Sequence, residues 1–134
     1  METSSIELSG AEIDRIELVG GRLRLHFPRV QIIKTMTGSV ERTRWWQAGD
    51  LVIDAAEPLA PLPQAPVVCA GGDIDENIYT YRDMIPIPLD SRGGVGCDLR
   101  LADSEARISV RGQALRLEME GVPKYIEHIR PGDH

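Results

Sequence analysis

The side chains that could bind a ligand are concentrated in one stretch of this sequence, from Gly71 to Leu89. Five acids and one arginine lie between positions 71 and 90, which gives the segment a net charge of −4 in a chain of net charge −6. Carboxylates clustered beside two phenols could hold a hard cation or receive a basic partner, because close like charges favour a counter-charge. The candidate binding residues are Asp73, Asp75, Asn77, Tyr79, Tyr81, Arg82 and Asp83.

The spacing of Asp73, Asp75 and Asn77 matches the first three oxygen ligands of a calcium loop. The match then fails, because Ile78 stands where the loop needs glycine and Met84 where it needs a bidentate acid. The sequence therefore gives no reason to assign a metal site or a cofactor.

A catalytic use of the same stretch is the alternative interpretation. Asp75 and Asp83 could act as acid and base beside Tyr79 or Tyr81 in a hydrolase or isomerase, with or without a divalent metal. This hypothesis requires the two carboxylates to converge, which the sequence of one strand does not establish. The common catalytic motifs are absent from the sequence, so whether the protein is an enzyme stays open, with a non-catalytic role favoured.

A basic row is the second candidate site. Between positions 15 and 44 seven bases stand against two acids, a net charge of +5. Arginines with an aromatic side chain for stacking are typical of surfaces that bind anions or single-stranded nucleic acid. The acidic chain as a whole repels phosphate, however, so nucleic acid is disfavoured. The residues of this alternative anion face are Arg22, Arg24, His26, Arg42, Arg44 and Trp46.

The two cysteines, Cys69 and Cys97, are 28 positions apart and belong to no CxxC motif. Cys69 stands in an apolar run, and neither thiol has a histidine cluster nearby. The sequence predicts two buried free thiols.

Period-two alternation and glycine-rich turns predict the fold. The clearest strand is 22–27, where Leu23, Leu25 and Phe27 alternate with Arg22, Arg24 and His26. About nine to ten short strands and no helix are expected, which favours a single-domain, all-β, antiparallel β-sandwich or β-barrel. Besides 22–27, the segments with the pattern of a strand are 13–19, 30–36, 40–48, 51–56, 67–70, 77–85, 97–102, 106–110, 114–119 and 124–129.

The whole chain, residues 1–134, is expected to form one domain. Residues 1–8 and 130–134 are expected to be flexible, and 57–66 to be a stiff proline-rich loop. No signal peptide or apolar span is visible, so we expect a soluble cytoplasmic protein that does not contact membranes. Pro86 and Pro88 should place their strand at a sheet edge.

These observations favour a non-catalytic module that binds a protein partner or a small ligand through the acidic and tyrosine-bearing stretch 73–83. The opposed charge regions and the expected edge strand also favour a homodimer.

Overall fold

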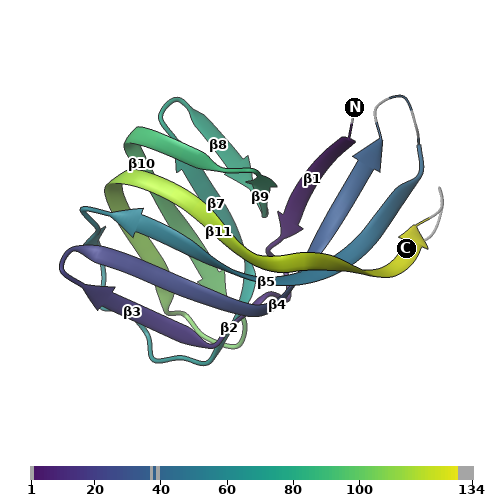
Figure 1. The fold of residues 1–134 in the computed structure, drawn as a ribbon. Coiled ribbons are helices and arrows are strands. Elements are labelled where there is room, and N and C mark those ends of the chain that lie inside the picture. Colours follow the sequence, from purple (N-terminus) through teal and green to yellow (C-terminus); the bar gives the residue numbers. More distant parts are fainter. Residues whose placement is uncertain (1, 37, 39, 130–134) are drawn as a thin grey trace.

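The computed structural model describes residues 2–36, 38 and 40–129, so the expected tail 130–134 lies outside the described residues. In this part the protein is all-β and antiparallel, as predicted, with eleven strands and no helix that could cross a membrane (Figure 1). The strands are β1 (Glu2–Glu7), β2 (Glu12–Ile13), β3 (Arg15–Val19), β4 (Arg22–Met36), β5 (Arg42–Asp54), β6 (Glu57–Pro58), β7 (Val67–Glu76), β8 (Tyr79–Arg82), β9 (Met84–Ile87), β10 (Asp90–Leu101) and β11 (Arg107–Ile129).

All strands belong to one strongly curved sheet. Its order is β2-β7-β10-β11-β5-β4-β1-β9, with β3 paired to β4, β6 to β11 and β8 to β7. The sheet is open, because β2 and β9 end the path without pairing to each other, and it does not close into a barrel. The prediction that Pro86 lies at an edge is confirmed, since β9 is the last strand of the sheet.

The expectation of short strands was wrong for five of the eleven strands, β4, β5, β7, β10 and β11, which have 10 to 23 residues. Strand β4 has 15 residues and continues through Pro28, where the pairing with β5 shifts register between Phe27 and Val30. Strand β11 has 23 residues and continues through the glycines at 112 and 121, with a shift between Glu120 and Lys124. Prolines and glycines that predict turns mark bends and bulges here, because an extra residue bends a strand without ending it.

The acidic stretch also folds differently from the expectation. Gly71 and Gly72 lie inside β7, and the acids that follow them continue that strand to Glu76. Asn77, with φ of 57°, forms the turn to β8, and Asp83, with φ of 59°, separates β8 from β9. The predicted strand 77–85 is therefore two strands, since a left-handed residue interrupts an extended run.

The core fills the compact half of the molecule, which we call the body. Leu23, Leu25 and Phe27 of β4 are fully buried, as the alternation predicts, and contribute to one cluster with side chains of β5, β7, β10 and β11. Strand β1 also contributes, because Ile6 is fully buried and pairs with Ile32 of β4. Residues 2–7, which were expected to be flexible, form the paired strand β1 in the structure.

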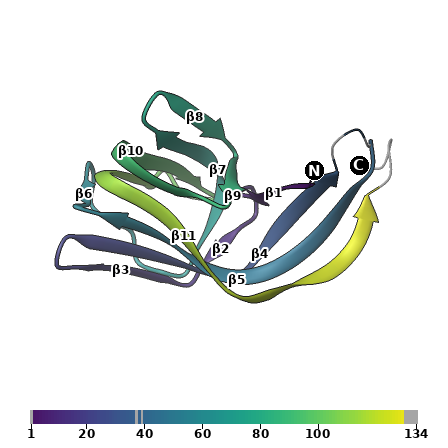
Figure 2. The same cartoon turned by 45° about the horizontal axis from the view of Figure 1, so that its top comes forward.

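The other half of the sheet projects from the body as an arm (Figures 1 and 2). The arm comprises β1, residues 30–36 of β4, residues 42–48 of β5 and residues 121–129 of β11. Its inner face continues the core side of the sheet, since Ile32, Trp45 and Tyr125 are register partners and Ile32 belongs to the core. Its outer face carries Trp46.

Candidate functional site

An aromatic pair forms the centre of the inner face of the arm. The rings of Trp45 and Tyr125 meet edge to face, with centroids 5.3 Å apart and planes at 76°. Lys34 places its ammonium 4.5 Å from the centroid of Trp45, and the indole N–H donates to Thr43 Oγ1 over 2.8 Å. Trp45 packs against the core and is half-buried, whereas Tyr125 is 55% exposed. The apolar surface is thus continuous from the core, through Trp45, to the exposed ring of Tyr125.

A depression of about 200 Å³ lies on the inner face toward the tip of the arm. His128 Nε2 lies 3.0 Å from Glu41 Oε2 in it, and Lys34 Nζ lies 3.8 Å from Glu2 Oε1. Met36 is 53% exposed there. The depression therefore offers apolar surface together with both signs of charge, which suits the binding of another chain. Its lining residues are Glu2, Lys34, Met36, Glu41, Thr43 and His128.

The outer face of the arm has its own cation and aromatic cluster. The guanidinium of Arg29 lies 4.6 Å from the Trp46 ring centroid, and the ammonium of Lys124 lies 5.9 Å from it. Arg44 contacts Gln31 and the carboxylates of Glu7 and Glu127. Trp45 and Trp46 therefore occupy opposite faces, as their parity predicts.

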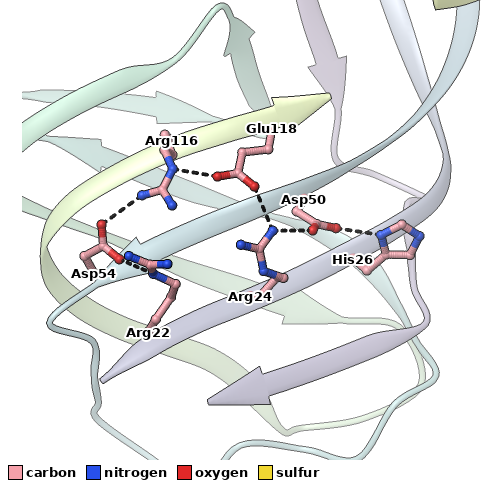
Figure 3. Close-up of polar contacts among 7 residues, drawn as sticks. All are labelled: Arg22, Arg24, His26, Asp50, Asp54, Arg116 and Glu118. Atoms are coloured by element: carbon pink, nitrogen blue, oxygen red, sulfur yellow. Dashed lines mark hydrogen bonds and ion pairs between the residues drawn. The ribbon is translucent and has the colours of Figure 1, made fainter. Parts of the chain in front are cut away.

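Seven ionisable side chains form a continuous network on the outer face of the body (Figure 3). They come from β4, β5 and β11, which bring alternating basic and acidic residues into register. The contacts in order are Arg22–Asp54 (2.7 Å), Asp54–Arg116 (2.8 Å), Arg116–Glu118 (2.8 Å), Glu118–Arg24 (2.8 Å), Arg24–Asp50 (2.6 Å) and Asp50–His26 (2.6 Å).

The electrostatics of this network bear on the anion-face hypothesis. Hydrogen bonds from Arg24 and Arg116 lower the pKa of Glu118, and those from Arg22 and Arg116 lower the pKa of Asp54. The basic row does share one face, as predicted, but its arginines are balanced by these carboxylates within the chain. Their positive charge is therefore largely compensated.

The remaining residues of the anion face lie at a different place on the sheet. Arg24 pairs with Val52 in register, whereas Arg44 pairs with Ile33 in the arm and Arg42 with Thr35. The structure thus places β4 and β5 side by side, but separates the residues of the body from those of the arm.

The carboxylates of the stretch 73–83 bind different partners. Asp75 accepts hydrogen bonds from Thr80 Oγ1 and from Arg111, each over 2.8 Å. Asp83 accepts from the backbone N–H of Gly72 over 3.0 Å and from Arg100 over 3.1 Å. The two carboxylates are engaged by different arginines, and the catalytic hypothesis stays a prediction.

The tyrosines and the amide of this stretch are also placed by the hairpin of β7 and β8. Tyr81 donates to Glu76 Oε2 over 2.9 Å, and this acceptance by a carboxylate raises the pKa of the phenol. Tyr79 is 63% exposed, and Asn77 donates to the carbonyl of Arg92 over 3.0 Å. Arg82 pairs in register with Asp73.

The proline-rich loop lines a larger depression, of about 460 Å³, that sequence reasoning missed. Pro63 and Pro66 form one side of it, and Leu101 with Ala102 from the end of β10 forms the other. No local pattern in the sequence pairs the loop with the end of β10, because the contact depends on the course of the whole sheet.

The two cysteines confirm the prediction of buried free thiols. Burial raises the pKa of Cys69 to about 11 and that of Cys97 to about 12. Thiols of this kind are poor nucleophiles at neutral pH, because the reactive thiolate is scarce.

Comparison with known proteins adds no relative. No protein family matches the chain, and no curated protein or solved structure does so either. The arm and the charge network are the two functional candidates that single-strand patterns did not reveal. The sequence alone does not reveal the aromatic pair. Trp45 and Tyr125 are recognised as neighbours only once the register of β5 against β11 is known.

Proposed function

We propose that this protein is a non-catalytic, all-β binding module that binds a second copy of its own chain through the inner face of the arm. The observation that carries the proposal is the aromatic pair of Trp45 and Tyr125 at the point where the core side of the sheet leaves the body. A sheet normally buries one face against another layer. Here the same face continues into an arm on which Tyr125 and Met36 remain more than half exposed.

A sheet edge of the arm supports the same proposal. Pairing of β11 with β10 ends at Arg116, and from Glu118 to Ile129 the only strand paired to β11 in the described part of the chain is β5. Unpaired backbone groups along such an edge favour contact with another chain. Pro123 and the register shifts limit indefinite strand addition, so a closed pair is favoured over a fibre.

The charges of the depression favour a second copy as the occupant. Lys34 and His128 stand beside Glu2 and Glu41, so the surface offers both signs of charge at one place. Two copies related by a twofold axis can set the bases of one against the acids of the other, because an isologous interface must be complementary to itself. We expect this pairing to occur in a soluble cytoplasmic protein.

The other hypotheses receive less support. A ligand site on the stretch 73–83 stays a prediction, with Asp75 and Asp83 already engaged within the chain. An anion or nucleic-acid surface on Arg22 and Arg24 must compete with Asp54, Asp50 and Glu118.

Sedimentation velocity over about a hundredfold range of concentration tests the proposal. The wild type should change from monomer to dimer, and Tyr125→Ser or Met36→Ser should weaken the dimer at least tenfold. Val19→Ser is the matched control, because Val19 is 74% exposed on strand β3 of the body. A wild type that stays monomeric throughout, or a control that weakens equally, would contradict self-association.

A further inference from the structure

The depression beside the proline-rich loop has the size of a site for a small molecule. Its volume of about 460 Å³ lies within the range of roughly 300 to 1,000 Å³ that such sites occupy. None of the described residues that line it belongs to the arm, so the depression is separate from the surface proposed to bind a second copy.

Much of the lining is apolar. Leu101, at the end of β10, is buried and belongs to the core, and Val67, at the start of β7, packs against the core. Beside them Val68 is 41% exposed, and the rings of Pro63 and Pro66 add further apolar surface. Apolar surface that is open to solvent gains free energy when the apolar part of a ligand covers it.

The walls of the depression are fixed within the chain. The backbone N–H of Ala102 donates to the carbonyl of Val68 over 2.8 Å, which ties the end of β10 to the start of β7. Asp103 turns the chain with φ of 56°, and Ser104 Oγ then accepts from the N–H of Ala106 over 3.0 Å. On the other side the prolines of the loop restrict the backbone. A preformed depression of this kind costs a ligand little in ordering the protein.

The charged side chains of the lining are both acidic. Glu12 of β2 and Asp103 contribute carboxylates, and no Lys, Arg or His is among the described lining residues. Within the part of the chain that the structure describes, neither carboxylate forms an ion pair or accepts a hydrogen bond. Asp50, Asp54 and Glu118 differ from them, because arginines balance their charges. Two uncompensated carboxylates beside apolar surface favour a ligand that is both cationic and apolar.

We propose that this depression binds a small organic cation, namely an amine with an apolar body. The ammonium group is attracted by the carboxylates of Glu12 and Asp103. The apolar body packs against Pro63, Val68 and Leu101. This site goes beyond the self-association proposed above and does not depend on it.

Titration of the isotope-labelled protein with phenethylamine, followed by NMR of the backbone amides, tests this site. The amides of 67–68 and 101–104 should shift saturably, with a dissociation constant on the order of millimolar. Phenethyl alcohol keeps the ring but has no charge, and ethylamine keeps the charge but has no ring. Each should bind at least fivefold more weakly than phenethylamine, because each lacks one of the two features that the lining recognises.

Two variants remove the charge of the lining. Glu12→Gln and Asp103→Asn should each weaken the binding of phenethylamine at least threefold. Both residues are exposed, and asparagine accepts the left-handed conformation at position 103, so both variants should fold. Glu105→Gln is the matched control, since Glu105 is an exposed acid near Asp103 in the chain that does not line the depression. It should change the affinity less than twofold.

Four results would overturn the proposal. The first is an absence of shifts at 67–68 and 101–104, and the second is equal affinity for phenethylamine and phenethyl alcohol. The third is equal weakening by Glu105→Gln, which would show that the net charge of the protein attracts the amine. The fourth is binding of a short alanine peptide with one central lysine at the same amides and at least tenfold more tightly, which would assign the depression to a protein partner.

Discussion

Trp45 and Trp46 are neighbours in the chain and lie on opposite faces of strand β5. Trp45 meets Tyr125 on the inner face and packs against the core, whereas Trp46 lies near the cations of Arg29 and Lys124 on the outer face. Consecutive residues of a strand must point to opposite sides of the sheet. In the arm this rule gives each face its own aromatic centre.

The two tryptophans should differ in their effect on stability. Trp45→Ala should lower the free energy of unfolding by about 2 to 3 kcal/mol, because it removes a half-buried aromatic from the core margin and from Tyr125. Trp46→Ala should lower it by about 1 kcal/mol, since Trp46 is not among the side chains packed against the core and loses mainly cation–π contacts. Urea denaturation at low protein concentration measures both values, and equal losses would contradict the assignment of faces.

The charge network should make stability depend on pH through Glu118. Its pKa in the folded protein lies below the ordinary value of 4.5, so the ionised form is stabilised by folding. This contribution is present above about pH 4.5 and is lost as the pH falls through the lowered pKa. Glu118→Gln should therefore cost about 0.5 to 1 kcal/mol at pH 7, a modest value because the side chain is 42% exposed, and much less near pH 3.

Chemical denaturation at the two pH values checks the Glu118 prediction. Glu17→Gln on strand β3 is the control, because Glu17 is exposed and should change stability little at either pH. A Glu118→Gln loss of equal size at both values would show that the ionised carboxylate is not the source of the stabilisation.

The thiols should be inert in the folded protein. With pKa values of about 11 for Cys69 and about 12 for Cys97, little thiolate is present at pH 8 and both groups are buried. A coloured disulfide reagent should react slowly with the native protein and rapidly with two equivalents after unfolding. Rapid native reaction of either cysteine would contradict the burial.

Gly72 should tolerate no side chain. A Cβ there would lie 2.6 Å from the carbonyl oxygen of Asp98 and 2.7 Å from the Cα of Leu99, and its φ of 154° disfavours other residues. Gly72→Ala should therefore destabilise the protein by about 3 kcal/mol. Gly94→Ala is the control, because nothing lies within 4 Å of its Cβ position, and it should change stability by less than about 0.5 kcal/mol. Thermal unfolding compares the two, and similar losses would contradict the close approach of β7 and β10.

Gly72 also shows which features of the fold the sequence predicts and which it does not. Alternation along 22–27 correctly predicts a strand with Leu23, Leu25 and Phe27 buried, because one buried face imposes a period of two. A glycine pair before clustered acids predicts a turn, yet these glycines lie inside β7, where β10 approaches too closely for a Cβ. The close approach of β10 determines where these glycines lie, and a pattern within one segment does not reveal a contact with a distant strand.

The candidate sites show the same division. The parity of Arg22, Arg24 and His26 was predictable, but the acids that balance them come from β5 and β11. In the sequence, Asp75 and Asp83 belong to a cluster of acids. In the folded sheet, Arg111 of β11 pairs with Asp75, and Arg100 of β10 pairs with Asp83. Charge counted along the chain thus differs from charge in the folded sheet.

Photo-crosslinking of the purified protein tests the central claim most directly. A photoreactive phenylalanine analogue replaces Tyr125 in one variant and Tyr79 in the other, since both tyrosines are more than half exposed and lie on different parts of the sheet. The account predicts a covalent dimer from position 125, with the crosslink mapped to residues of the arm in the second copy, and little dimer from position 79. A dimer formed mainly from position 79, or none from either position, would contradict the proposal that the inner face of the arm binds a second chain.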